Sequence, residues 1–238
     1  MLGRFLELSL ATADIAASVD FYERLGFTQL PCNDAWPHAY CALTDGRLCL
    51  GLHRYESPAT SLCFVHSGLL AHADRLETGG LRSSERHLGF EEFHHVRYAA
   101  PDGQTLTLLE ARTCSPPAPR AAPPCGWWSA WSVPSRDFAA SAAYWERLDF
   151  IAHEVEALPI EHQPLSTDHL NLALHRPEDL RWPALVFASD RMEEIVSGLQ
   201  AREFDTRRGL PAGLEPRCNG LLAAPEGTRL LLLQDDYG

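Results

Sequence analysis

The chain of 238 residues lacks several features that identify common classes of protein. Its apolar runs stay well below the roughly 20 residues that a membrane-spanning helix needs. The first ten residues, MLGRFLELSL, lack the basic start, apolar run and small-residue cleavage site of a signal peptide. Basic residues form no cluster and the formal net charge is −12, so a surface for nucleic-acid phosphates is not expected. We therefore expect a cytoplasmic protein that binds neither nucleic acid nor membrane.

Cysteine lacks the spacing that a zinc cluster or a disulfide framework needs. The seven cysteines are an odd number, and no CxxC or CxxxC pair occurs. Cys41, Cys49 and Cys63 lie in apolar runs, where cysteine is usually a small buried hydrophobic residue. The motifs GxGxxG, HExxH and GxSxG and the phosphate-binding P-loop are also absent. These absences leave the internal pattern of the chain as the main source of information.

The chain does contain a long internal repeat. The stretch DIAASVDFYERLGF (residues 14–27) returns as DFAASAAYWERLDF (residues 137–150), with eight of fourteen positions identical at an offset of 123 residues. That offset is too long for a solenoid repeat and is about the length of one small domain. The sequence therefore predicts two copies of one fold.

A proline-rich segment separates the two copies. Residues 113–126, TCSPPAPRAAPPCG, contain five prolines, and such a segment favours an extended, semi-rigid spacer. We therefore predict a first module at residues 1–112, a linker at 113–126 and a second module at 127–238.

Within each copy the residue patterns predict a strand, a helix and three strands, followed by the same order again. RFLELSLAT alternates like a strand, and Asp14 fits the N-cap of the helix that follows. Gly26 suits the left-handed position just past that helix, where the second copy has Asp149. The late turn PDGQ and the run TLTLLEA predict a closing hairpin.

The Asp-capped helix with Ser and Phe-Tyr, the Leu-Gly-Phe that follows and the late PDGQTLTLLE resemble the vicinal oxygen chelate superfamily. This superfamily includes glyoxalase I, extradiol dioxygenases, and fosfomycin- and bleomycin-resistance proteins. The resemblance covers both halves of the chain. It implies an α+β fold of tandem glyoxalase-like domains, each built of two βαβββ units curled around a cleft. Since this fold carries many functions, the resemblance alone does not predict a reaction.

The resemblance also implies three metal-ligand positions on strands that face the cleft. They lie seven residues before the capping Asp, at the start of the strand before the second helix, and four residues after the Gly of the late turn. Where the superfamily usually has His, His and Glu, the two copies have Glu7, Ser61 and Thr107, and Ala130, Ala184 and Leu231. Neutral hydroxyls are poor ligands for transition metals. We therefore expect no metal ion and no cofactor at this position.

Histidine is the residue type that could still complete an unusual site with Glu7. His94 and His95 are neighbours on a predicted strand, so one of them must face the cleft. His53 and His175 recur at matching places, in LGLHR and LALHR. The simpler interpretation of this recurrence is a strand end where the imidazole meets solvent.

Strand alternation predicts different linings for the two clefts. The first is polar and carries one acid, with Glu7, Ser9, Thr105 and Thr107. The second is largely apolar, with Trp128, Ala130, Ser132, Arg229 and Leu231. A carboxylate that loses water in a closed cleft suits a general base, so Glu7 is the candidate catalytic residue unless it pairs with an arginine or stays hydrated. Trp128 suits a flat ligand, unless it packs in the core with Trp127 and Trp131.

These observations predict a protein that binds a small organic molecule without the superfamily metal. The residues expected to contact that molecule are Ser9, Ser61, His95, Thr107, Trp128 and Arg229. Two alternatives stay open. One is a metal-dependent or Glu7-based lyase, isomerase or dioxygenase. The other is a structural or protein-interaction module whose clefts are filled by their own side chains. The sequence also leaves open whether the clefts are completed within one chain or between two chains of a homodimer.

Overall fold

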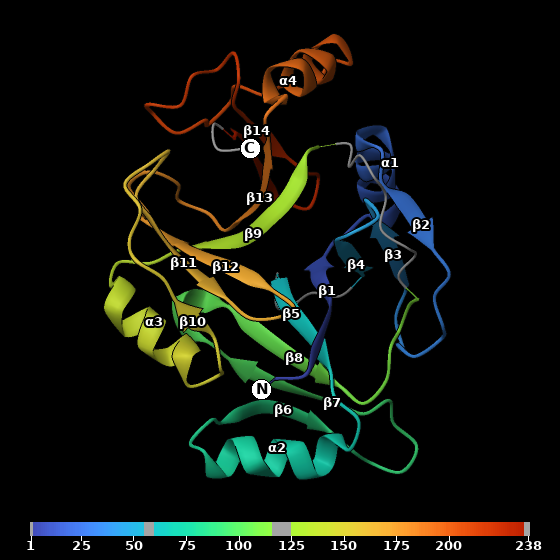
Figure 1. The fold of residues 1–238 in the computed structure, drawn as a ribbon. Helices are drawn as coiled ribbons and strands as arrows, with labels where there is room; N and C mark the ends of the chain where they lie inside the picture. The colour runs from blue at the N-terminus through green and yellow to red at the C-terminus, as the bar shows by residue number, and fades with distance from the viewer. Residues whose placement is uncertain (1, 55–59, 116–124, 236–238) are drawn as a thin grey trace.

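The computed structural model describes residues 2–54, 60–115 and 125–235 and contains two mixed sheets (Figure 1). The first sheet has eight strands in the order β2-β3-β4-β1-β5-β8-β7-β6, and the second has seven in the order β10-β11-β12-β9-β13-β15-β14. We call the parts of the chain that carry these sheets module 1 and module 2. The predicted α+β fold with two tandem modules is confirmed.

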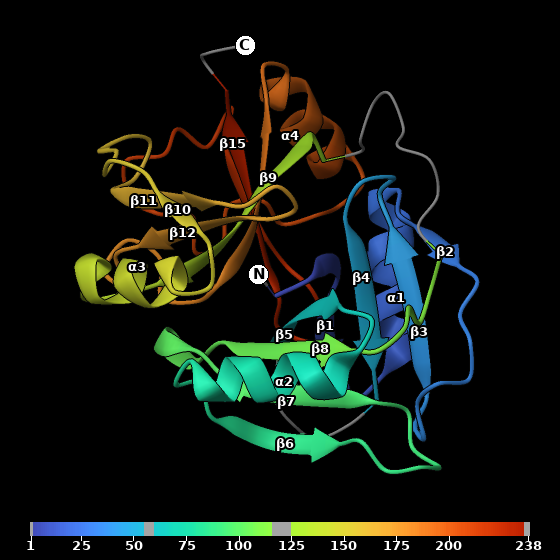
Figure 2. The same ribbon diagram turned by 60° about the horizontal axis from the view of Figure 1, so that its bottom comes forward.

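Module 1 contains the first half of the repeat. Its elements are β1 (Arg4–Ala11), α1 (Ile15–Leu25), β2 (Thr28–Leu30), β3 (Tyr40–Thr44), β4 (Cys49–His53), β5 (Thr60–Val65), α2 (Leu69–Thr78), β6 (Ser83–His87), β7 (His95–Ala99), the short 3-10 helix η1 (Pro101–Gly103) and β8 (Thr105–Leu109). Figure 2 shows α2 lying across β8, β7 and β6, while α1 lies behind β3 and β4. Buried residues of both helices pack in one cluster with Leu8 and Leu10 of β1, so both helices cover the same side of the curled sheet, and the opposite side is the cleft face.

Module 2 repeats this order with one change. Its elements are β9 (Trp127–Pro134), α3 (Phe138–Glu146), β10 (Ile151–Ala152), β11 (His162–Ser166), β12 (Asn171–His175), β13 (Ala184–Ser189), α4 (Met192–Ala201), β14 (Gly220–Ala223) and β15 (Arg229–Gln234). After α4, residues 202–219 form turns where the other three units have a strand. The last unit therefore contributes one strand fewer to its sheet.

The repeated helices begin and end as their residues predict. The Asp14 carboxylate accepts from the Ala17 amide at 3.1 Å, and Asp137 accepts from Ala140 at 3.0 Å. Gly26 has a φ of 100°, a left-handed conformation that glycine adopts without strain. Asp149 holds a φ of 67° at the matching place in module 2. The capping expected from the sequence is confirmed in both copies.

The helix-facing sides of both sheets share one apolar core. Leu8 and Leu10 of β1 lie in the same buried cluster as Trp131 of β9 and Phe187 of β13. The Trp131 indole nitrogen donates to the side-chain carbonyl of Gln104 at 2.8 Å, so this buried polar atom is satisfied by the other module. Trp131 is therefore a core residue, as the packing alternative anticipated.

The repeated serine of each helix contacts the late turn of the other module. Ser18 on α1 donates to Glu226 at 2.8 Å, and Ser141 on α3 donates to Asp102 at 2.6 Å. Tyr22 adds a second hydrogen bond to Glu226, at 2.6 Å. The repeat thus supplies a reciprocal pair of contacts between the modules.

Most of the predicted linker, residues 116–124, lies outside the described residues. Its first residues pack on module 1. The backbone amide of Asn33 donates to the Thr113 carbonyl at 3.1 Å, and the backbones of Cys32 and Cys114 form an isolated antiparallel β-bridge. The module boundaries stay a prediction. Within the described ranges, no helix is both long and apolar enough to cross a bilayer.

Candidate functional site

The acid at the first superfamily ligand position, Glu7, is fully buried on the cleft face of β1. Ser9 Oγ donates to its Oε1 at 2.9 Å, and Tyr40 OH donates to its Oε2 at 2.5 Å. Burial and the adjacent carboxylate raise the pKa of Tyr40 well above its usual value, so the phenol stays the proton donor. Both oxygens of Glu7 are therefore held by hydroxyl groups of the protein.

The Glu7 carboxylate lies directly over Gly51 on the neighbouring strand β4. A Cβ atom at Gly51 would come within 2.2 Å of Glu7 Oε1 and 2.6 Å of its Cδ, distances that no real contact allows. The parallel pairing of Ser9 with Gly51 places this glycine beside the carboxylate. The glycine inside the strand LCLGLH therefore makes room for an acid.

The other two superfamily positions in module 1 satisfy each other. Ser61 Oγ and Thr107 Oγ1 are 2.6 Å apart, and Ser61 also donates to the Thr105 carbonyl at 3.2 Å. Cys63 lies between these positions and Glu7, with its sulfur 3.0 Å from Ser9 Oγ. Burial and the nearby Glu7 raise the pKa of Cys63 to about 12, so it remains a neutral thiol. The superfamily set in this chain is one carboxylate and two hydroxyls, each already hydrogen-bonded, and it does not fit a transition-metal ion.

Two histidines connect Glu7 to the surface. His53 Nε2 lies 3.5 Å from Glu7 Oε1, and His53 Nδ1 lies 2.9 Å from His38 Nε2. Burial is the main cause that lowers the pKa of His38, which favours a neutral ring. A general base must reach its substrate. Because Glu7 is buried, it can act on a bound molecule only through neighbouring groups such as His53 with His38, or Tyr40.

Trp36 closes the cleft of module 1 across its middle. Its ring centroid lies 5.1 Å from that of His53 on β4 and 5.2 Å from that of His95 on β7. An apolar cluster on the same face contains Leu6, Cys63 and Cys114, with Trp36 packed against it. The centre of the cleft is therefore filled by side chains, and open space lies at its two ends.

The cleft face of module 2 is filled by apolar side chains. The three superfamily positions, Ala130, Ala184 and Leu231, are all buried. Ala184 and Leu231 belong to an apolar cluster that also contains Val186, Leu214 and Leu221. Leu214 comes from the turns at 202–219, the segment that replaces a strand. Arg229, which was predicted to contact a ligand here, instead has its guanidinium carbon 4.7 Å from the centroid of the Trp182 ring. Apolar side chains therefore occupy the cleft face of module 2.

The recurring histidines are not exposed strand ends. His53 and His175 are both buried. Ser132 Oγ lies 2.6 Å from His175 Nδ1, and His175 Nε2 donates to the Leu180 carbonyl at 2.8 Å. Burial lowers the pKa of His175 to about 4. The interpretation of LHR as a solvent-facing motif is wrong, because Trp36 and Tyr40 pack against the His53 ring and the turn that follows β12 covers His175.

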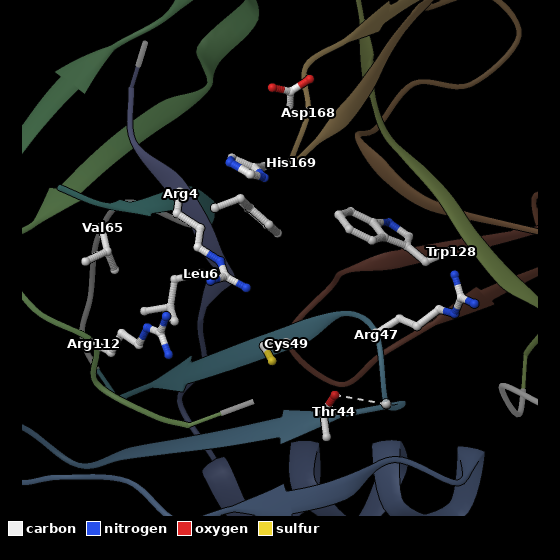
Figure 3. A pocket seen from close by; sticks show the side chains of 12 residues that line it. Arg4, Leu6, Thr44, Arg47, Cys49, Val65, Arg112, Trp128, Asp168 and His169 are labelled. Carbon is white, nitrogen blue, oxygen red and sulfur yellow. Dashed lines mark hydrogen bonds between the residues drawn. The ribbon is translucent and has the colours of Figure 1, made fainter. Parts of the chain in front are cut away.

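A cavity of about 380 Å³ opens where module 1 meets module 2, and we call it the junction cavity. Figure 3 shows Arg4 and Arg112 on one side of it and Arg47 and Trp128 on the other. Its floor is apolar and includes Leu6, Val65 and the Phe5 ring, which stacks on Trp128 at 5.7 Å between centroids. Trp128 therefore lines this cavity between the modules.

Positive charge dominates the rim of the junction cavity. Three guanidinium groups line it, from Arg4, Arg47 and Arg112, against one carboxylate from Asp168. Arg47 lies 3.9 Å over the ring of Trp127. No carboxylate among the described residues comes within ion-pair distance of Arg4 or Arg112, so their charge is available to a ligand. In a chain of net charge −12 this is an unusual concentration of cationic groups.

A second cavity of about 490 Å³ lies at the opposite end of the cleft, beside the edge strands β6 and β7, and we call it the edge cavity. Trp36, His38 and His95 line it, together with Glu85 and His87 of β6. Glu85, His87 and His95 each offer a ligand atom, and these atoms lie within 4.8 Å of one another. The edge cavity is therefore the place in the described chain where side chains could gather around a metal ion.

The predicted contact residues are thus divided among several places. Ser9, Ser61 and Thr107 lie beside Glu7 in the filled centre, His95 lies in the edge cavity and Trp128 in the junction cavity. Their roles stay predictions. Sequence reasoning missed the arginines, Tyr40 and the β6 residues. A single sequence signal pointed to this region, the glycine inside the strand pattern at Gly51.

Neither a protein-family model nor a curated protein sequence matches the chain. Solved structures do match it over nearly its whole length. A mutant of 4-hydroxymandelate synthase from Streptomyces coelicolor has a TM-score of 0.66 and 14% identity, covering 98% of this chain and 93% of that one. Catechol 2,3-dioxygenase gives 0.61 and 16%, covering 98% and 87%. The 2,3-dioxygenase LapB from Pseudomonas sp. KL28 gives 0.60 and 18%, covering 98% and 92%. At these identities the likeness concerns the fold, and it confirms the two-module arrangement predicted from the repeat.

Proposed function

Because the chain has the two-module fold of the vicinal oxygen chelate superfamily, we propose that it binds a small organic anion in the junction cavity without a metal at the superfamily position. The observation that carries this proposal is the rim of three guanidinium groups over an apolar floor. Arginine binds carboxylates through paired, charge-assisted hydrogen bonds, which makes it well suited to hold an anionic group.

The floor determines the rest of the ligand. Leu6 is buried, and the stacked rings of Phe5 and Trp128 form a flat aromatic wall. Aromatic walls favour flat, apolar ligand bodies by stacking. The volume of about 380 Å³ is near the lower end of the range for small-molecule pockets, roughly 300–1,000 Å³. An aromatic carboxylate of one or two rings therefore matches both the rim and the floor.

The hydrogen bonding at the superfamily position supports binding without a metal there. An ion would have to displace Ser9 and Tyr40 from Glu7 and separate Ser61 from Thr107. Of the three side chains at the superfamily positions, two offer only hydroxyl oxygens, which bind transition metals weakly.

Calorimetric titration with 2-naphthoate and with its neutral amide tests the proposal. The two compounds share one aromatic body, so the arginine rim predicts that the carboxylate binds at least about tenfold more tightly. Substituting Arg112→Gln or Arg4→Gln should weaken binding of the carboxylate and leave binding of the amide unchanged. Arg217→Gln, at an exposed arginine paired with Glu193, is the matched control. Equal affinity for the two compounds, or no binding of either, would contradict the proposal.

A further inference from the structure

Glu85, His87 and His95 come together because the edge strand β6 pairs in antiparallel register with its neighbour β7. Glu85 and His87 are two residues apart on β6, so their side chains lie on one face of that strand. Pairing of β6 with β7 sets His87 opposite His95 and Glu85 opposite Arg97. The superfamily ligand positions lie on β1, β5 and β8, so this cluster is a separate place in the fold.

The neighbours of the two rings turn the same nitrogen, Nε2, of each toward Glu85. His95 Nδ1 lies 3.0 Å from the Phe93 carbonyl and must donate to it, which leaves Nε2 as an acceptor 3.9 Å from Glu85 Oε1. His87 Nδ1 lies 3.6 Å from Glu92, and its Nε2 lies 2.6 Å from Glu85 Oε1. A carbonyl or carboxylate behind the far ring nitrogen is the arrangement that orients metal-binding histidines.

The carboxylate is oriented in the same way. Arg97 Nη1 donates to Glu85 Oε2 at 2.5 Å, so Oε1 is the oxygen that faces both rings. The rings stack with centroids 4.4 Å apart and planes 11° apart, and the Nε2 atoms of both rings face Glu85 Oε1. Three lone-pair donors therefore converge on one point, and they repel one another unless a proton or a cation lies among them.

We propose that this point binds a divalent transition-metal ion of the zinc, cobalt or iron(II) type, through Glu85, His87 and His95. Two imidazoles and one carboxylate form a ligand set that suits these ions. The surrounding cavity favours a cation, because Asp34, Glu91 and Glu92 line it along with Glu85 against one guanidinium group, Arg97.

Three protein ligands leave coordination positions open. A metal site with three protein ligands keeps room for water or a bound molecule, whereas a structural site is closed by four. Here the open side faces the edge cavity of about 490 Å³, next to Trp36 and His38. The ion would thus be accessible to a small oxygen-bearing ligand. This site does not depend on the junction cavity, so either proposal can fail alone.

The test is metal retention by the full chain after treatment with a chelator, addition of Co²⁺ or Zn²⁺ and desalting. Elemental mass spectrometry should find about one ion per chain, and Co²⁺ should give a visible absorption band. Glu85→Gln and His95→Ala, one variant on each strand, should each weaken binding at least about 100-fold, more than loss of an outer partner does. His94→Ala, at the partly buried neighbour whose ring contacts the Gly89 carbonyl, should retain the ion.

Three results would overturn the proposal. Wild-type protein that retains no ion would mean that a proton on His87, between Glu85 and Glu92, occupies the point instead. Retention by both Glu85→Gln and His95→Ala would place the ion elsewhere. Loss in Glu7→Gln, with retention in the β6 and β7 variants, would assign it to the superfamily position. Circular dichroism on each variant separates loss of the ion from loss of the fold, and unchanged 2-naphthoate binding shows that the junction cavity is intact.

Discussion

Glu7 and Gly51 act as one unit at the centre of module 1. The acid needs the space that a side chain at Gly51 would fill, and Tyr40 and Ser9 need the acid as their acceptor. A sequence can suggest that an acid replaces the usual histidine at this position. It cannot show that the acid points across to β4, because that depends on which neighbouring residue lacks a side chain.

Gly51→Ala should lower the free energy of unfolding by about 2–4 kcal/mol. Overpacking costs about 1–3 kcal/mol, and a displaced Glu7 also loses buried hydrogen bonds. Urea unfolding measures the change. Gly198→Ala is the control, since that helical glycine has open space around its Cβ position and should gain up to about 1 kcal/mol. If Gly51→Ala left the free energy of unfolding unchanged or raised it, as Gly198→Ala should, Glu7 would lie elsewhere.

His175 should make stability fall in mild acid. Its pKa is about 4 in the folded chain and about 6.5 when unfolded, so the unfolded state binds the proton first as the pH drops. The stability lost between pH 6.5 and pH 4 is about 3 kcal/mol from this residue. Unfolding at pH 7 and pH 4 should show a smaller loss for His175→Gln than for wild type, while exposed His169→Gln behaves like wild type. Equal losses for all three proteins would contradict the buried neutral ring.

At the scale of elements, the repeated helices were predictable and the edge strand β6 was not. The caps, the repeated serines and the late turns are local patterns, and each forms where its residues predict. The strand β6, SSERH, is polar along its whole length, so no apolar alternation identifies it. The repeated order predicts three strands after the helix, but no residues could be assigned to this one, so the pairing that brings Glu85 and His87 to His95 was missed.

Ser18→Ala and Ser141→Ala should each cost about 1 kcal/mol of stability, because each leaves a carboxylate of the other module short of a partly buried hydrogen bond. The two losses should add in the double variant, since the contacts share no partner. Urea unfolding again gives the values. Ser197→Ala, exposed on α4, is the control and should change stability by less than about 0.5 kcal/mol. If Ser18→Ala and Ser141→Ala changed the free energy of unfolding no more than Ser197→Ala does, the reciprocal contacts would not hold the modules together.

At the scale of the whole molecule, duplication produced two clefts that have diverged. Module 2 has closed its cleft with apolar side chains, and module 1 has filled the centre of its own and left a cavity at each end. The two cavities carry opposite charge. The repeat predicted two modules, but the junction cavity joins the start of β1, the β3–β4 turn, Arg112 and residues 168–169. Residues so far apart meet only through the packing of the modules, which no local pattern describes.

The most direct test of the account is the affinity for 2-naphthoate of chelator-treated protein, measured by calorimetry with and without added Zn²⁺. If the arginine rim of the junction cavity holds the anion, the affinity should be the same in both conditions and should fall at least about tenfold in Arg112→Gln. If 2-naphthoate bound only with Zn²⁺ present, and bound equally well to Arg112→Gln, the account would be contradicted. The small molecule would then bind at a metal centre.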